Sequence, residues 1–278
     1  FGPAVKAAYD KDGKPTPAAS GFARSCGVDI DALQTIDKDG VEKLVFRADK
    51  AGEETSTLLP GIVAAALAKL PIPRKMRWGS TRDEFVRPVY WLVMLFGDDV
   101  IDTELFGIKS GRITHGHRFH CGADISLTSP AEYEGKLQSP GYVIADYEVR
   151  KNNVRAQVQA QGAALHGDVQ IDEDLLEEVT SMVEWPVALT GRFDEHFLSV
   201  PPEALISSMK NHQKTFYVLD KDGNMLPNFV AVANLDSKDP AQVIAGNERV
   251  IRPRLADAAF FFESDRKQTL ASRLEQLG

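Results

Sequence analysis

The sequence predicts an α+β fold with short, mainly antiparallel sheets and flanking helices, arranged in two or three subdomains. Helical and strand-like segments follow one another along 278 residues without the regular βαβ rhythm of a doubly wound sheet. Turn clusters such as Asp220-Lys221-Asp222-Gly223-Asn224 separate strand-like runs, and their Asp-Gly step favours an antiparallel hairpin. Hydrophobic residues make up 43% and charged residues 26% of the chain, which is ordinary globular composition.

We expect a first subdomain at residues 1–78. Thr16 and Pro17 predict the start of a helix as its cap and first-turn proline, and Gly27 predicts its end. Pro60 either kinks the Ala- and Leu-rich helix around it or marks the start of that helix. A proline-bracketed basic segment then closes the subdomain. The expected elements are a turn at 10–15, a helix at 18–26, a turn at 37–40, a strand at 43–48, a helix at 56–70 and the closing segment at 71–79.

A second subdomain is expected at residues 79–168. Gly97-Asp98-Asp99 predicts a hairpin turn between two apolar strands. Ser129 and Pro130, followed by an early acid, predict the start of a short helix. The expected elements are strands at 89–96, 100–106 and 112–119 and helices at 129–137 and 146–165.

A third subdomain, residues 169–278, ends in a long helical segment. Pro186 cannot donate a backbone hydrogen bond, so the strand that contains it is expected at a sheet edge. The expected elements are an acidic helix at 172–182, an edge strand at 185–189, a helix from 201 to about 211, strands at 215–219 and 228–233, and helix from 240 onwards.

Composition excludes several classes of protein. The longest apolar run, 89–96, is far shorter than the roughly 20 residues of a membrane-spanning helix. Cys26 and Cys121 lie far apart without metal-ligand spacing, which favours reduced thiols in a cytoplasmic protein. The net charge of −8 repels nucleic acid over the whole molecule, so RNA contact requires a local basic patch. The opening Phe1-Gly2-Pro3 lacks an initiator Met, and we interpret it as a fragment boundary.

The histidines at 115, 117 and 120 suggest a metal-dependent hydrolase as a rival hypothesis. On a strand, His115 and His117 share a face, and His120 follows from the next turn. The fixed cation of Arg118 disfavours a divalent metal in the same cluster. We therefore expect hydrogen-bonded imidazoles and predict no metal site.

Basic residues concentrate in three segments and in one further run where a helix meets a strand. Arginine beside an aromatic side chain suits phosphate contact and base stacking, whereas nearby acids favour simple ion pairs, and both interpretations stay open. In the run around His212, a grip on phosphate or a partner competes with a helix end that satisfies its last carbonyls, which we prefer. The candidate RNA-binding or interface residues are Arg74, Lys75, Arg77, Trp78, Arg112, His117, Arg118, Lys210, His212, Lys214, Arg249, Arg252 and Arg254.

Several multi-residue segments occur in an order that is specific to one family. They are Gly2-Pro3-Ala4-Val5, Ala19-Ser20-Gly21-Phe22-Ala23-Arg24, Met76-Arg77-Trp78-Gly79, Phe85-Val86-Arg87-Pro88, Gly116-His117-Arg118-Phe119, Glu184-Trp185-Pro186, His212-Gln213-Lys214 and residues 246–258. In this order they resemble the β subunit of bacterial α2β2 glycyl-tRNA synthetase, as an N-terminal to middle portion of it. Position 115 is His where the family pattern has Arg, which weakens the metal hypothesis further.

The resemblance implies a noncatalytic part of glycine–tRNA ligase, which attaches glycine to its tRNA at the expense of ATP. It places ATP and Mg on the α subunit, so no catalytic residue and no cofactor is expected in this chain. No phosphate-binding loop, Rossmann glycine fingerprint or nucleophile elbow is present in the sequence. The expected partners are the α subunit and the tRNA for glycine, in a cytoplasmic α2β2 assembly without a membrane. The alternatives are a pure assembly scaffold without RNA contacts, or a metal-dependent hydrolase or editing module at the histidines.

Overall fold

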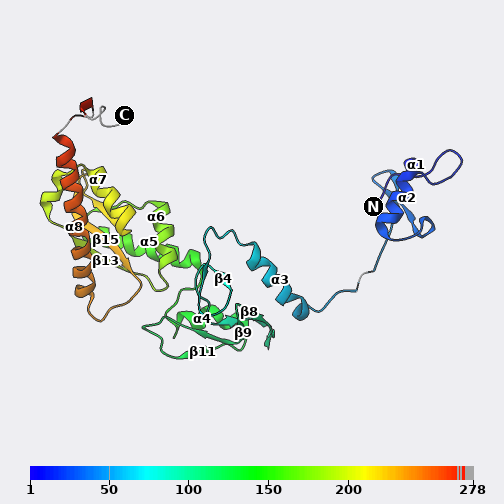
Figure 1. Cartoon of the computed structure of the whole chain (residues 1–278), viewed down its shortest axis with the longest axis horizontal. Helices are drawn as coiled ribbons and strands as arrows, with labels where there is room; N and C mark the ends of the chain where they lie inside the picture. The colour runs from blue at the N-terminus through cyan, green and yellow to red at the C-terminus, as the bar shows by residue number, and fades with distance from the viewer. Residues whose placement is uncertain (50, 268, 270, 273–278) are drawn as a thin grey trace. The chain divides into compact units, whose positions relative to one another are not determined.

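The computed structural model describes residues 1–49, 51–267, 269 and 271–272, and it forms two compact units (Figure 1). Unit 1 is Phe1–Leu58 and unit 2 is Leu59–Gly278, so the boundary lies in helix α3 (Thr55–Lys69). The mixed α+β class with short, mainly antiparallel sheets is confirmed. The predicted subdomain limits at 78/79 and 168/169 stay predictions. No described helix combines the length and the apolar composition that a membrane span requires.

Unit 1 packs two helices against a hairpin. The helix predicted at 18–26 is confirmed as α2, and Gly27 ends it in the left-handed conformation. Thr16 was expected to cap this helix with its side chain, but its hydroxyl donates to the carbonyls of Ala7 and Ala8 instead. The strand expected at 43–48 ends at Val45. Its partner, the strand at Gln34–Lys38, was not predicted. The elements are α1 (Val5–Ala8), α2 (Pro17–Cys26), the 3-10 turn η1 (Ile30–Ala32), β1 (Gln34–Lys38) and β2 (Val41–Val45).

Helix α3 corresponds to the helix predicted at 56–70. Pro60 lies inside the helix and does not begin it. Every residue of α3 is described, and none of them is buried.

The small-sheet region, residues 76–145, contains strands of two to four residues. The continuous strands predicted at 89–96 and 100–106 are wrong. The first breaks into one strand that pairs in parallel with β9 and another that pairs with β7. The second breaks at residues 101–103, which lie outside any strand between β7 and β8. The chain then turns back from β8 to β9 at Phe106 and Gly107, which both have positive φ. The strands are β3 (Met76–Arg77), β4 (Glu84–Phe85), β5 (Leu92–Val93), β6 (Leu95–Phe96), β7 (Asp99–Val100), β8 (Glu104–Leu105), β9 (Ile108–Gly111), β10 (Ile113–His115) and β11 (Asp124–Ser126).

Two short helical elements complete this region. They are the 3-10 turn η2 (Pro130–Glu132) and α4 (Tyr133–Gln138), which together match the helix predicted at 129–137. Ser129 makes no side-chain cap, and Glu132 accepts the amide of Thr128. The apolar cluster beneath them is small and is centred on Ile125, Leu127 and Leu137.

The sheet region, residues 146–266, contains one antiparallel sheet of four strands in the order β12-β14-β15-β13, with helices on both faces (Figure 1). Successive strand residues face opposite sides. Phe216 and Val218 thus pack on α5 and α6, while Phe229 packs on α7 and α8. The strands are β12 (Asp168–Val169), β13 (Val187–Arg192), β14 (Phe216–Leu219) and β15 (Met225–Ala233). The helices are α5 (Tyr147–Ala164), α6 (Glu173–Met182), the 3-10 turn η3 (Glu195–Ser199), α7 (Pro202–Ser207), the π-helical turn η4 (Ser208–His212) and α8 (Pro240–Arg266).

Most elements of the sheet region match the prediction. Asp146 and Asp172 cap α5 and α6 by accepting the amides of Val149 and Leu175. Strand β13 lies at the sheet edge, as expected from Pro186. The two-residue strand β12 was not anticipated.

Candidate nucleic-acid interface

Residues 116–121, here named the histidine turn, follow β10 and are held by close backbone packing. Gly116 lies against Gly141, and a Cβ at position 116 would stand 2.4 Å from the carbonyl oxygen of Gly141. The next amide, of His117, donates to the same carbonyl at 2.7 Å. No larger residue fits position 116 unless this backbone contact moves, so the sequence Gly-His fixes where the turn begins.

His117 anchors the turn from beneath. Its side chain is buried at 2% exposure, and Nε2 lies 2.7 Å from the carbonyl oxygen of Asn234, just beyond β15. Nδ1 accepts the amide of Phe119 at 3.3 Å, so Nε2 must carry the proton that goes to Asn234. Both ring nitrogens are therefore engaged, and His117 positions the turn from inside the protein. This side chain was a predicted contact residue, and the structure places it away from solvent.

The turn presents an arginine and a phenylalanine to solvent. Arg118 is exposed, Phe119 is 74% exposed, and the guanidinium carbon lies 5.9 Å from the phenyl centroid. Aromatic rings continue from the turn as His120, Tyr142 and Trp185, with successive centroids 5.0 and 5.3 Å apart. Because bases stack on aromatic rings and phosphates pair with arginine, this surface has the chemistry that holds single-stranded RNA.

The three histidines do not converge on one point. His115 Nδ1 lies 3.2 Å from Asp124 Oδ1, and its ring packs on Trp91. His120 Nε2 accepts the amide of Asp236 at 3.1 Å. Among the described residues, no three His, Cys, Asp or Glu side chains are grouped so that they could hold a metal ion. The geometry thus gives the hydrolase or editing alternative no support.

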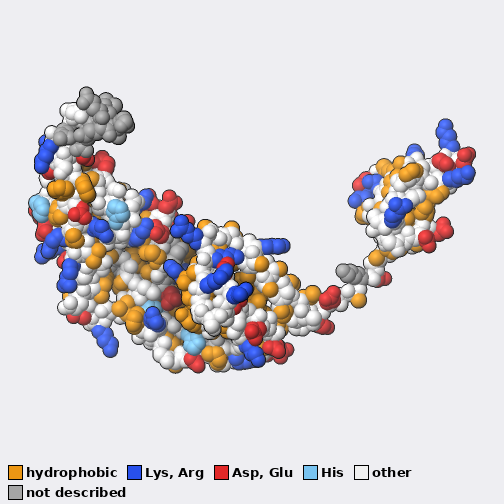
Figure 2. Space-filling view, in the orientation of Figure 1, with side chains coloured by type: hydrophobic (Ala, Val, Ile, Leu, Met, Phe, Trp, Pro, Cys, Tyr) orange, Lys and Arg blue, Asp and Glu red, His pale blue; other side chains and the backbone are white. Residues whose placement is uncertain are grey.

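The first predicted basic segment forms the β3–β4 hairpin and its approach, named here the basic hairpin (residues 74–87). Arg77 pairs with Glu84 across the two strands, Nε to Oε1 at 2.6 Å, and Trp78 packs on Phe106. Arg74 and Lys75 are exposed. Lys and Arg side chains gather over this part of the molecule in Figure 2.

A shallow hollow of about 270 Å³ adjoins the basic hairpin. Residues 85–91 line it, and they include the exposed rings of Tyr90 and Trp91. The basic hairpin therefore combines open cations with aromatic surface, as the histidine turn does. Sequence reasoning identified the cations and missed Tyr90, because nothing local in the sequence marks this ring as exposed.

Four other predicted contact residues bind intramolecular partners. Arg112 donates to the carbonyls of Leu127 and Asp98, both at 3.0 Å, and so ties β-strand ends together. The remaining three form ion pairs. These are Lys210 with Asp172 at 2.6 Å, Lys214 with Glu178 at 2.8 Å and Arg252 with Asp194 at 3.1 Å.

The Lys210–Asp172 pair joins η4 to the cap of α6. The hydrogen bond from Lys210, followed by the amide of Leu175, lowers the pKa of Asp172 below its ordinary value. The same hydrogen bond raises the pKa of Lys210. Lys210 was a predicted contact residue, and in the structure its ammonium group pairs with Asp172.

The last predicted cations lie on the sheet region. Arg249 and Arg254 are exposed on α8, and His212 is exposed at the end of η4. Within the described ranges, none of these three has a salt-bridge partner. They lie in other elements than the histidine turn and the basic hairpin.

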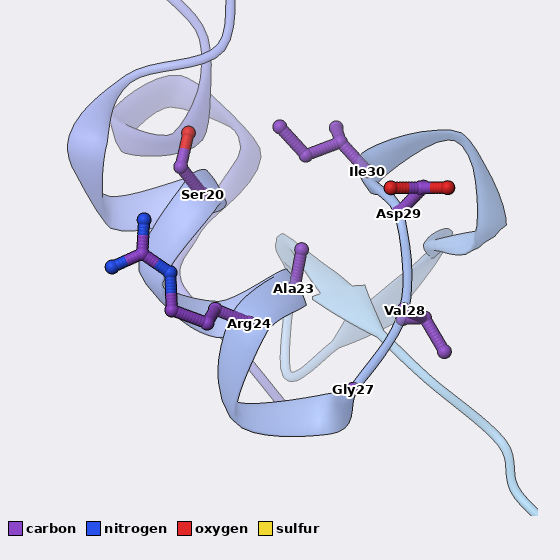
Figure 3. Close-up of a pocket in the computed structure, with 7 residues that line it drawn as sticks. All are labelled: Ser20, Ala23, Arg24, Gly27, Val28, Asp29 and Ile30. Atoms are coloured by element: carbon purple, nitrogen blue, oxygen red, sulfur yellow. The ribbon is translucent and has the colours of Figure 1, made fainter.

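A hollow of about 520 Å³ in unit 1 was not anticipated from the sequence (Figure 3). It lies where α2 ends at Gly27, over the small side chain of Ala23. Its two charged groups, Arg24 and Asp29, stand on different sides of the hollow in Figure 3 and do not point at a common centre. The arrangement offers no converging set of ligand groups, so the candidate interface stays in unit 2.

Comparison with known proteins agrees with the resemblance seen in the sequence. A family model described as glycyl-tRNA synthetase beta subunit matches residues 1–278. The chain is 58% identical over 276 residues to the glycine–tRNA ligase beta subunit of Hahella chejuensis and 54% identical over 277 residues to that of Marinobacter nauticus. In both alignments 99% of this chain is covered, and it spans 40% of the length of the relative.

Proposed function

The chain belongs to the glycyl-tRNA synthetase beta subunit family, and from this premise we propose that it contributes tRNA contact and α-subunit assembly to glycine–tRNA ligase. In this proposal the chain supplies no group to glycine activation. ATP and Mg act on the α subunit of a cytoplasmic α2β2 enzyme, and this chain orients the RNA, which lowers the barrier by positioning.

One observation carries the RNA half of the proposal: the histidine turn holds Arg118 and Phe119 outward on a fixed backbone. An exposed phenyl ring gains nothing from folding, because its apolar surface stays in water. Stacking on an unpaired base removes that surface from water, and the adjacent guanidinium meets the phosphate. The basic hairpin, with Arg74, Lys75 and Tyr90, is the second surface of the same kind.

The local charge matters because the molecule as a whole is acidic. A net charge of −8 repels an RNA backbone at long range. Contacts therefore depend on a few exposed cations, and each one that meets a phosphate contributes to the salt dependence of binding. Paired cations such as Arg252 contribute little, since they already neutralise an acid.

The test measures tRNA affinity of the complete α2β2 enzyme at several salt concentrations. Arg118→Ala should weaken binding and reduce the slope of log K against log salt by about 1. Phe119→Ala should cost about 1–3 kcal/mol, the usual value of one stacked base, with little change in slope. Arg252→Ala is the matched control and should leave both quantities unchanged.

The pure scaffold is the second candidate function. It predicts that Arg118→Ala and Phe119→Ala leave tRNA affinity and charging intact while the subunits still assemble. If Arg118→Ala and Arg252→Ala behave alike in the binding assay, the RNA role of the histidine turn is wrong.

A further inference from the structure

Helix α3 is an apolar helix whose side chains are not buried against the rest of the described structure. It has 15 residues and carries no charged side chain from Thr55 to Ala68. Its apolar residues are distributed around the whole circumference, yet none is buried, and Ile62 is 57% exposed. The nearest charge along the helix is Lys69, in its last turn.

A helix that is apolar on all sides belongs in a large protein core or in a membrane. A 15-residue helix is about 22 Å long, which is shorter than the roughly 30 Å of a bilayer core. No described helix has the features of a membrane span. The physical requirement is therefore a protein environment that covers α3 from more than one direction.

A second copy of the same helix meets this requirement poorly. Two α3 helices related by a twofold axis cover one side of each other and leave the opposite side in water. A contact between two such short helices also falls well below the roughly 800 Å² per partner of a stable interface. A partner subunit that docks on one face of α3 also leaves the opposite face in water.

Further segments of the same polypeptide can cover α3 from more than one direction. The relatives matched here are much longer proteins, because this chain spans 40% of their length. Gly61, Ala64 and Ala65 bring small side chains to α3, which lets neighbouring backbone approach closely. Several elements of one domain can then surround the helix, as in an ordinary core.

We propose that α3 is the core helix of a folded unit that is completed by sequence of the same polypeptide outside residues 1–278. This surface is then neither the dock for the α subunit nor an RNA contact. The inference depends on family membership and on the apolar circumference of α3, and it holds whether or not the histidine turn binds tRNA.

The test places a photo-crosslinking amino acid at position 62 of the full-length protein within the intact α2β2 enzyme. After irradiation, the expected crosslink joins position 62 to a peptide outside residues 1–278, and the product keeps the mass of one subunit on a denaturing gel. A crosslink to a peptide within residues 1–278, a crosslink to the α subunit, a product with the mass of two subunits, or a probe that reacts only with water overturns the proposal.

A smaller substitution guards against disturbance by the bulky probe. In the full-length protein, Ile62→Cys should react with a maleimide about 100-fold more slowly than Lys221→Cys, a control at an exposed hairpin turn, because a buried thiol reacts only after local opening. Both rates are read from the modified peptides by mass spectrometry, with the unfolded protein as the reference for full reactivity. Equal rates at the two positions would show that α3 stays in water and would also overturn the proposal.

Discussion

The sheet region and the small-sheet region bury their side chains in different ways. In the sheet region, helices cover both faces of four strands, so that Phe216 and Phe229 on opposite faces are both fully buried. In the small-sheet region the strands are two to four residues long, and the apolar cluster is small. Here long side chains reach backbone carbonyls instead, as Arg112 does at Asp98 and Leu127.

This difference determines whether a single substitution affects the stability of a whole region or the position of one turn. Apolar burial in the sheet region is shared among many side chains, so a core mutation lowers the stability of the whole region. In the small-sheet region, one hydrogen bond can fix the position of a turn. The candidate interface lies in the second kind of structure and depends on the first for one of its anchors, the carbonyl of Asn234.

The largest expected effect is in the sheet core. Phe216→Ala should lower the free energy of unfolding by about 3–5 kcal/mol, because it removes a fully buried ring from a packed sheet face. Urea unfolding of the full-length protein measures it. Phe260→Ala, which changes an exposed ring on α8, should stay within about 0.5 kcal/mol. Similar losses from the two variants would contradict the assigned core.

A smaller, local effect is expected from the histidine anchor. His117→Ala leaves the Asn234 carbonyl without its partner, which costs about 1–3 kcal/mol. Because the loss lies at the turn, hydrogen exchange should speed up at residues 116–121 and 141 more than in β14 and β15. An equal rise in exchange in the sheet region would contradict a local role of His117 at the turn.

An acid-dependent contribution is expected from the Asp172–Lys210 pair. The pKa of Asp172 is lowered by folding, so its contribution is present above the ordinary value of 3.8 and is lost as the pH falls through the lower folded pKa. Asp172→Asn keeps an N-cap acceptor but should remove this acid-dependent step. Free energies of unfolding between pH 2.5 and pH 6, chosen to bracket about 3.8, test it. Lys210→Met should flatten the same part of the curve, and an unchanged curve would refute the pairing.

The smallest effect is expected at the surface of α8. Arg252 pairs with Asp194 where both side chains are exposed, so solvent screens the attraction. Arg252→Ala should change the free energy of unfolding by less than about 0.5 kcal/mol in the same urea assay. A larger loss would mean that α8 depends on this pair for its attachment.

Sequence reasoning succeeded where the signals were local. Helices α5 and α6 were predicted at 146–165 and 172–182, and the capping acids Asp146 and Asp172 act within one turn of the residues they cap. The strands at 89–96 and 100–106 failed because an apolar run predicts a strand regardless of its partners. The break at residues 101–103 and the turn at Phe106, a bulky residue at positive φ, depend on pairing that the run itself does not encode.

The candidate site divides in the same way. Arg118 was predicted from its basic neighbours, and it is exposed. Phe119 was missed as part of the surface because its exposure depends on how the histidine turn is anchored at Asn234. Arg112 and Lys210 were predicted contacts whose partners, Leu127 and Asp172, lie elsewhere in the chain, so nothing in their own segments indicated these partners.

The sequence separation of His117 from Asn234 also determines how long the nascent chain lacks this hydrogen bond during synthesis. The two residues are 117 positions apart in the chain. At about 5–20 residues per second, the ribosome adds Asn234 roughly 6–23 s after His117. During that interval the histidine turn keeps its backbone contact with Gly141 but lacks the hydrogen bond from His117 to Asn234. A nascent or truncated chain that ends before Asn234 should therefore hold Arg118 and Phe119 less firmly than the full chain does.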